Sequence, residues 1–358
     1  MKIEDRARAL FLAAARAEAL GGEPEARAEV WERAAGVARG VGEEPIFLRF
    51  ARARRCEALL SPAALADLET QARYHAFRWE ELREAAEAAL RALAGAGIRP
   101  VLLKGLAAAG SLYDPPGLRP MRDLDILVRA DELDRAESAL LAGAFRESAG
   151  SPAIDFDRHH HLRPLFHEGT GACVEVHRGI AAPEGDLAGF PPPEEIRAGA
   201  RPSPLFGGWA DCPSPTGFVL SSCVHLTYAD KVHRRAQNLV DLIRALDAKG
   251  GEVDWERLLR AAASPAAARS LCVPLAYLAR EGLPTAPAPV RAELVRRARL
   301  RSWELALLHA LTDRYRLGAP PPWRWISGRV SNVLWSQALR PRSALARVLG
   351  ALAEALRR

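Results

Sequence analysis

The sequence predicts an α+β protein in which a small mixed β-sheet core is flanked by N-terminal and C-terminal helical regions. Three observations predict this fold class. Helical periodicity fills about the first 95 residues, short apolar segments separated by glycine turns follow from Ile98, and helical patterns return from about Thr216. We expect three regions: a helical region over 1–95, a core over 96–204 and a second helical region over 205–358.

The N-terminal region ends in an amphipathic segment, residues 80–96. Its apolar residues recur at spacings of three and four, which places them on one face of a helix. They are Leu82, Ala86, Leu90 and Leu93. Gly95 and Gly97 then end the predicted helix.

The core begins with IRPVLLKG, residues 98–105, which is predicted to be a short buried strand that runs into a glycine turn. A short helix, LAAAGSLY, and a rigid loop, DPPGLRP, follow. In the next predicted strand, RDLDILV, Asp123 and Asp125 alternate with apolar residues, so both carboxylates lie on one face. A helix is expected over Asp131–Leu141, ending at Gly143.

A β-hairpin is predicted between His159 and His177, because two apolar segments, HLRPLF and ACVEVH, flank the turn residues EGTG. Pro164 cannot donate a backbone hydrogen bond, so we expect the first segment at a sheet edge. Residues 181–204 are rich in proline and glycine and are expected to be a linker or a substrate loop.

Composition narrows the functional classes. The net charge is +6 over 358 residues, and all but four of the 50 Lys and Arg residues are arginines. We attribute this bias to a GC-rich coding genome rather than to a nucleic-acid partner. The start of the chain fits neither a signal nor a transit peptide, and no run of about 18 apolar residues occurs, so we expect a cytoplasmic protein with no membrane span. The five cysteines lack a CxxC pair and are expected to be reduced thiols.

Three carboxylates are the main candidates for chemistry: Asp123 and Asp125 on one strand, and Glu175 on a neighbouring strand. Such a set can hold two divalent cations about 3.5–4 Å apart, which is the geometry that phosphoryl transfer needs. Carboxylate oxygens suit Mg²⁺ or Mn²⁺. One cation would activate an acceptor hydroxyl and the other would offset charge on leaving pyrophosphate. A pair of surface aspartates is the alternative.

Groups that could hold a triphosphate lie nearby in the sequence: Lys104, Arg119 and Arg122. Gly105, at a strand-to-helix turn, would let backbone N–H groups approach a phosphate. His177 shares its strand face with the third carboxylate and could orient the site or meet a phosphate. Because arginines are abundant in this chain, the alternative for Arg119 and Arg122 is that they are ordinary solvated surface residues.

The run VLLKGLAAAGSLYDPPGLRPMRDLDILV, with ACVEVH downstream, resembles the uncharacterised nucleotidyltransferase family within the DNA polymerase β-like nucleotidyltransferase superfamily, over roughly residues 95–245. The resemblance implies a core that moves a nucleoside monophosphate from an NTP to an acceptor. It matches Asp123 and Asp125 to the metal-binding pair, Glu175 to the third carboxylate and Gly105 to the glycine of the phosphate-binding turn. The turn departs from the superfamily pattern, because Leu106 stands where glycine or serine is usual.

Three other features carry weaker expectations. Adjacent histidines on an extended strand point to opposite faces, so at most His159 and His161 of the HHH run could converge. Plain strand entry is favoured, a nucleotide- or acceptor-facing role for one histidine comes next, and a zinc site comes last. His225 and Lys231 are expected to pack within a helix rather than line a nucleotide cleft. Tryptophans and arginines mix over residues 323–358, where a helical cap is favoured over an interfacial helix or partner surface.

We therefore predict a magnesium- or manganese-dependent nucleotidyltransferase with an NTP, ATP among the candidates, as co-substrate. The acceptor is expected to be a small molecule or a peptide rather than nucleic acid, because no concentrated basic stripe or RNA-binding motif is present. A catalytically degenerate binding module and an enzyme directed at tRNA or other RNA are the alternatives. Acceptor identity, the preferred NTP and the oligomeric state stay open.

Overall fold

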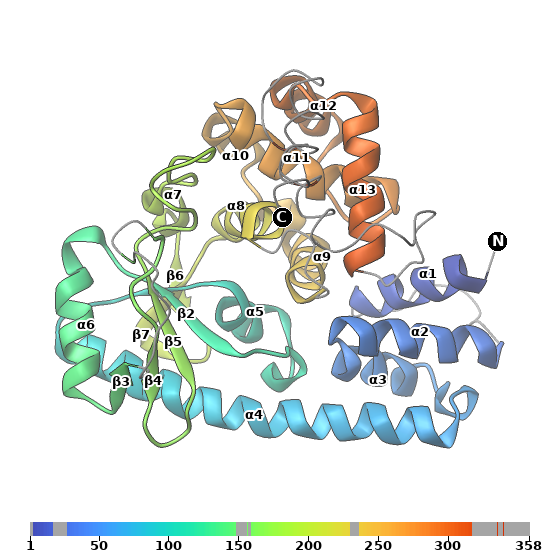
Figure 1. Ribbon diagram of the computed structural model, residues 1–358, viewed down its shortest axis with the longest axis horizontal. Helices are drawn as coiled ribbons and strands as arrows, with labels where there is room; N and C mark the ends of the chain where they lie inside the picture. Colours follow the sequence, from blue (N-terminus) through green and yellow to red (C-terminus); the bar gives the residue numbers. More distant parts are fainter. Residues whose placement is uncertain are drawn as a thin grey trace, which may run out of the picture. The chain divides into compact units, whose positions relative to one another are not determined.

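The computed structural model describes residues 3–16, 27–147, 156, 159–229, 236–316, 335 and 339 (Figure 1). Lys231, Trp323 and Trp325 lie outside the described residues. The chain forms two compact units. The first unit is helical and the second contains the β-sheet. The first comprises Met1–Leu68, Cys223–Gly250 and Trp255–Arg358, and the second Glu69–Ser222 and Gly251–Asp254.

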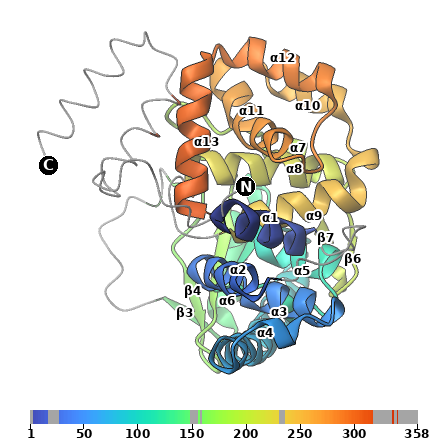
Figure 2. The same ribbon diagram turned by 90° about the vertical axis from the view of Figure 1, so that its right-hand side faces the viewer.

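The helical unit combines segments from both ends of the chain. Its helices are α1 (Ile3–Ala15), α2 (Ala28–Val41), α3 (Glu44–Ala53), α9 (Gln237–Lys249), α10 (Trp255–Ala261), α11 (Pro265–Arg280), α12 (Ala288–Ala298) and α13 (Ser302–Arg316). Figures 1 and 2 both show α10, α11 and α12 side by side. No helix of the described residues combines the length and apolar character needed to cross a membrane.

Two tryptophans are among the largest buried side chains of this unit. Trp31 of α2 is fully buried, with its ring 5.8 Å from that of Phe47. Trp335 is also buried, and its indole Nε1 donates to the carbonyl of Thr227 at 2.7 Å. Apart from Trp335 and Leu339, the segment 323–358 lies outside the described residues, so the expected helical cap stays a prediction.

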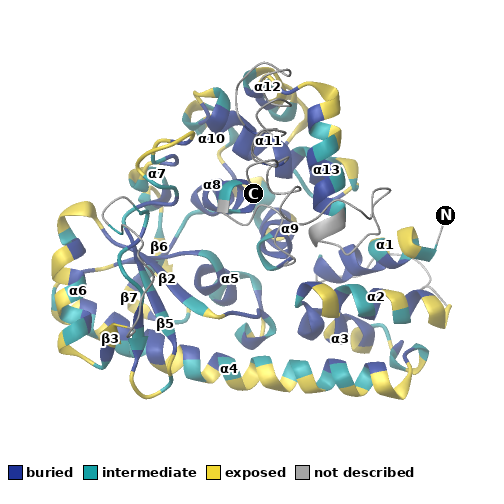
Figure 3. Ribbon diagram, viewed as in Figure 1, coloured by how far each residue is buried: buried dark blue, intermediate teal, exposed yellow. Residues whose placement is uncertain are grey.

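Helix α4 (Pro62–Gly95) is the longest described helix and carries the predicted apolar stripe. Leu82, Ala86, Leu90 and Leu93 are each at most 2% exposed. Figure 3 shows buried and exposed residues alternating along this helix, as the spacing of three and four requires.

The second unit is built on a seven-stranded mixed sheet in the order β3-β4-β5-β2-β1-β7-β6. The strands are β1 (Val101–Leu102), β2 (Asp123–Leu127), β3 (Phe145–Glu147), β4 (Leu165–His167), β5 (Cys173–His177), β6 (Arg201–Ser203) and β7 (Gly207–Cys212). Two pairings, β2 with β5 and β1 with β7, are parallel, and the others are antiparallel. The predicted α+β class with a mixed sheet is confirmed.

Besides most of α4, the helices of this unit are α5 (Lys104–Leu112), α6 (Leu133–Ala142), α7 (Pro193–Arg197) and α8 (Pro215–Val224). Helix α5 follows β1 immediately, and the backbone N–H of Leu103 donates to the carbonyl of Asp125 at 3.0 Å. This bond fixes the first turn of α5 beside the strand that carries the aspartates.

The structure corrects three local expectations. The predicted hairpin of β4 and β5 forms, but β4 is not at the sheet edge, because β3 pairs with its other side. Pro164 lies just before β4, where its missing donor does not matter. The stretch 181–204 is not loop throughout, since it contains α7 and β6, and the sheet continues through β7 beyond residue 204. Gly105 lies within the first turn of α5 rather than in a separate glycine turn.

Candidate active site

The register between β2 and β5 brings the carboxylates together. Asp125 lies directly opposite Glu175, and Asp123 lies opposite Cys173. Because side chains alternate along a strand, Asp123, Asp125, Glu175 and His177 all project from one face of the sheet. The sequence alternation predicted this shared face within each strand, and the parallel pairing adds the register between them.

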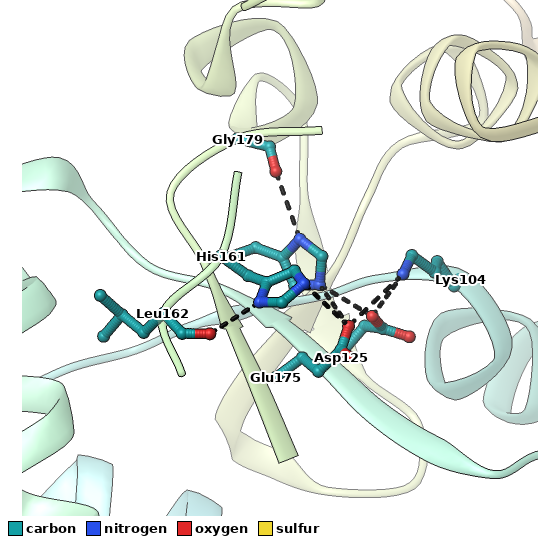
Figure 4. Close-up of polar contacts among 7 residues, drawn as sticks. Lys104, Asp125, His161, Leu162, Glu175 and Gly179 are labelled. Carbon is teal, nitrogen blue, oxygen red and sulfur yellow. Dashed lines mark hydrogen bonds and ion pairs between the residues drawn. The ribbon is translucent and has the colours of Figure 1, made fainter. Parts of the chain in front are cut away.

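Lys104 reaches the same face from the first turn of α5. Its Nζ is 2.6 Å from Asp125 Oδ1 and 3.9 Å from Glu175 Oε2 (Figure 4). Lys104 has a φ of 46°, in the left-handed region, which costs about 1–2 kcal/mol for a residue with a Cβ. The ion pairs with two carboxylates offset that cost and hold the ammonium at the site.

His177 is fully buried between the carboxylates and the backbone. Its Nε2 is 2.8 Å from Asp125 Oδ1 and 3.5 Å from Glu175 Oε2, and its Nδ1 is 3.3 Å from the carbonyl of Gly179. Burial and the charge of Lys104 disfavour the protonated ring, but the hydrogen bonds to both carboxylates prevail and raise the pKa of His177. Each ring nitrogen thus faces an acceptor, an arrangement that the imidazolium form satisfies.

Asp125 is the carboxylate whose ionised form is most strongly stabilised by its neighbours. It is 2% exposed. Burial alone would raise its pKa, but Lys104 and His177 hold the pKa of this carboxyl well below its usual range. Burial also opposes ionisation of Glu175, whereas its hydrogen bond to His177 lowers its pKa overall. Both carboxylates are therefore ionised at neutral pH.

Asp123 is in a different electrostatic position. Burial and the negative charge of Asp125 raise the pKa of Asp123, and Lys104 and Arg119 only partly oppose them. Of the three carboxylates, Asp123 is the one whose pKa is raised. A bound cation would stabilise its ionised form.

Gly105 and Arg119 form the wall of the site next to Lys104. A Cβ at position 105 would lie 2.7 Å from the side chain of Met121 and 2.9 Å from Arg119 Nη1. A larger residue at position 105 would therefore force the side chains of Met121 and Arg119 to shift. Arg119 is buried, and its guanidinium donates to the carbonyl of Pro120.

Arg122 is placed differently from the other predicted phosphate-binding residues. It is exposed, and together with burial its charge lowers the pKa of His75 on α4. Within the described residues, no hydrogen bond or ion pair joins Arg122 to the three carboxylates. The structure thus brings Lys104, Gly105 and Arg119 to the site but not Arg122.

One group of side chains fits a divalent cation. Asp125, Glu175 and His177 each offer a ligand atom, and these atoms lie within 4.8 Å of one another. Two carboxylates with an imidazole suit Mn²⁺ and related divalent ions, and the carboxylates also suit Mg²⁺. From the sequence we predicted Asp123 as one of the metal ligands. The group whose ligand atoms lie close together contains His177 in place of Asp123, and Asp123 lies next to this group on the same sheet face.

The three adjacent histidines converge, contrary to expectation. Ligand nitrogens of His159, His160 and His161 lie within 4.8 Å of one another. Residues 159 and 160 form a bend, and residue 161 pairs with His177 in an isolated bridge, so the extended-strand argument for opposite faces does not apply. Burial lowers the pKa of all three imidazoles, that of His160 to about 2, and they are neutral at pH 7.

His161 lies next to the carboxylates, although the sequence favoured plain strand entry for the histidine run and did not place this residue at the site. Its Nε2 lies 3.8 Å from Glu175 Oε2, and its Nδ1 is 2.6 Å from the carbonyl of Leu162 (Figure 4). The only sequence signal was the HHH run itself, and its register against β5 depends on the tertiary fold.

Comparison with known proteins identifies a family for the chain. Neither the curated proteins nor the solved structures compared with the chain include a match. A family model described as an uncharacterised nucleotidyltransferase matches residues 27–282, well over half of the chain and all of the site. With its carboxylates in register on two parallel strands and a match of that extent, the chain belongs to the uncharacterised nucleotidyltransferase family.

Proposed function

We propose that the chain is a metal-dependent, NTP-using nucleotidyltransferase that transfers a nucleoside monophosphate to a hydroxyl or phosphate of an acceptor. One observation carries the proposal: Asp125 and Glu175 face each other in register on parallel strands, with Asp123 on the same face. Family membership supports nucleotidyl transfer in general. The specific roles below are inferred from the geometry of the site.

Asp125, Glu175 and His177 are the residues that would hold a divalent cation, Mg²⁺ or Mn²⁺, with Asp123 completing the acidic surface. His177 would bind the cation through Nε2 only after releasing the proton of that nitrogen, since a metal ligand has to be deprotonated. When bound, the cation lowers the pKa of an acceptor hydroxyl and offsets negative charge on the phosphates. Lys104 and His177 keep Asp125 ionised and therefore ready to bind a cation. Glu175 is partly exposed, and it is the carboxylate best placed to accept the proton of an acceptor hydroxyl.

Lys104 is the proposed triphosphate ligand. Its ammonium is hydrogen-bonded to Asp125 but keeps a 20% exposed side chain, so it can turn from the carboxylate to a phosphate. It begins the nine-residue α5, whose N-terminal dipole favours anions. Gly105 keeps this turn free of a side chain, and buried Arg119 adds a fixed positive charge beside Asp123.

Acceptor choice is proposed to favour a small molecule or a peptide over nucleic acid. The core chemistry is shared by enzymes with unrelated acceptors, so acceptor recognition has to come from residues outside the carboxylate cluster.

Calorimetry tests the proposal directly. ATP, CTP, GTP and UTP are each titrated with Mg²⁺ into the wild-type chain, the double variant Asp123→Asn/Asp125→Asn and a control, Asp134→Asn, which changes one exposed aspartate of α6. Metal-dependent binding of one NTP by the wild type and the control is expected. Affinity should fall about 100-fold or more in the double variant, because the cation loses two of its carboxylates.

Turnover is measured next, as NTP-dependent release of pyrophosphate with pooled small-molecule and peptide acceptors. NTP binding that survives unchanged in the folded double variant would contradict the assigned carboxylates. Failure of the folded wild type to bind any NTP would contradict the enzyme and favour the degenerate binding module.

A further inference from the structure

A second group of potential metal ligands lies beside the carboxylates but shares no residue with them. It consists of His159, His160 and His161, defined here as the histidine triplet. The ring centroids are 4.1 Å apart for His159 with His160 and with His161, and 4.8 Å apart for His160 with His161. The bend at residues 159 and 160 turns all three rings toward one another, and the N–H of His159 donates to the carbonyl of Phe156 at 3.2 Å.

One buried ring nitrogen of the histidine triplet lacks a partner among the described residues. The Nδ1 of His159 is buried, and it has no hydrogen-bond partner among the described residues. A buried polar atom without a partner costs about 1–3 kcal/mol, so a group that accepts its lone pair would relieve that cost.

The tautomer of His161 is suited to metal binding. Its Nδ1 lies 2.6 Å from the carbonyl of Leu162, so Nδ1 carries the hydrogen and donates it. Its Nε2 is then left with a free lone pair. Metal-ligating histidines characteristically donate their second ring nitrogen to a backbone carbonyl or carboxylate in this way, which fixes the ring and its tautomer.

We propose that the histidine triplet binds a transition-metal cation of borderline softness, with Zn²⁺ as the best fit. Three neutral imidazoles match the ligand preference of Zn²⁺, Ni²⁺ and Cu²⁺, whereas Mg²⁺ and Ca²⁺ prefer oxygen. Three protein ligands leave one coordination position of tetrahedral Zn²⁺ for water or substrate. Because His161 Nε2 is 3.8 Å from Glu175 Oε2, this site borders the carboxylate cluster.

This inference goes beyond nucleotidyl transfer and does not depend on it, since no carboxylate assigned to that reaction is a ligand. The test therefore uses Zn²⁺ alone, without NTP. The chain carries no affinity tag, is stripped with a chelator, and is titrated with Zn²⁺ against a chromophoric competitor in buffer that contains excess Mg²⁺. Excess Mg²⁺ occupies oxygen-rich sites and leaves imidazole sites free.

The wild-type chain is expected to bind one equivalent of Zn²⁺ with a Kd of about 1 μM or tighter. His160→Ala should weaken binding about tenfold or more, because it removes one of three ligands. His75→Ala is the matched control, since His75 is also half-buried and its Nδ1 also has no partner among the described residues. Its Zn²⁺ affinity should equal that of the wild type.

Two further measurements keep the test decisive. Asp125→Asn should retain Zn²⁺; loss of Zn²⁺ in this variant with retention in His160→Ala would place the ion at the carboxylate cluster and overturn the proposal. The urea-unfolded chain should bind Zn²⁺ more weakly than the folded chain. Equal affinity would show that three consecutive histidines bind Zn²⁺ without the fold, and it would overturn the proposal. Absence of Zn²⁺ binding by the folded wild type would also overturn it.

Discussion

Asp123 and Asp125 share one strand face, yet replacing each by asparagine is expected to change stability in opposite directions. Asp125 Oδ1 accepts from Lys104 Nζ at 2.6 Å and from His177 Nε2 at 2.8 Å while 2% exposed. Asp125→Asn removes the charge that both cations face. Asp123→Asn removes a charge that burial and neighbouring Asp125 already disfavour.

The size of each effect follows from these contacts. Removing one partner of a buried ion pair costs about 3–5 kcal/mol, because the other charge is left uncompensated. His177 can release its proton and Glu175 lies 3.9 Å from Lys104 Nζ, so part of this cost is relieved and we expect about 2–3 kcal/mol for Asp125→Asn. For Asp123→Asn we expect no loss and a gain of up to about 1 kcal/mol.

Urea unfolding followed by far-UV circular dichroism measures both variants, at pH 7 with EDTA to exclude divalent cations. The change in midpoint at constant m-value gives the change in unfolding free energy. Asp134→Asn is the control for loss of one aspartate charge in the same unit. If Asp125→Asn were as stable as the wild type, or if both variants lost equal stability, the pairing of Asp125 with Lys104 and His177 would be refuted.

Three further predictions follow from single sites. Lys104→Met should raise the affinity of the carboxylates for Mn²⁺ about tenfold, measured by electron paramagnetic resonance, because a competing cation is removed; unchanged affinity would contradict its placement. Gly105→Ala should lower the unfolding free energy by about 1 kcal/mol, because the new Cβ would lie 2.7 Å from the Met121 side chain. The control Gly95→Ala should cause no loss, because nothing lies within 4 Å of a Cβ there. Equal effects of the two substitutions would argue against the close approach. Burial lowers the pKa of His309 to about 4, so the unfolded chain takes up this proton first and unfolding free energy should fall by about 3 kcal/mol as pH drops from about 6.5 to 4. His309→Gln should remove that part of the pH dependence, and a pH profile identical to the wild type would contradict it.

The local pattern of the sequence determined the elements that carry the site. Alternation in RDLDILV placed Asp123 and Asp125 on one strand face, and spacing of three and four predicted the buried stripe of α4. Both depend only on the repeat of a helix or strand, so they can be derived without knowing what packs against them. The family resemblance rested on the same local runs, and the match over residues 27–282 confirmed it.

Only the tertiary structure decided how these elements meet. The register of β2 against β5 sets Asp125 opposite Glu175, and the left-handed φ of Lys104 brings its ammonium to both. The strand order places β3 at the edge of the sheet, next to β4. The three residues of the histidine triplet lie close together because the chain bends there and is not an extended strand. Register, strand order and bends are set by contacts between residues far apart in the chain, whereas periodicity reports only which residues share a face.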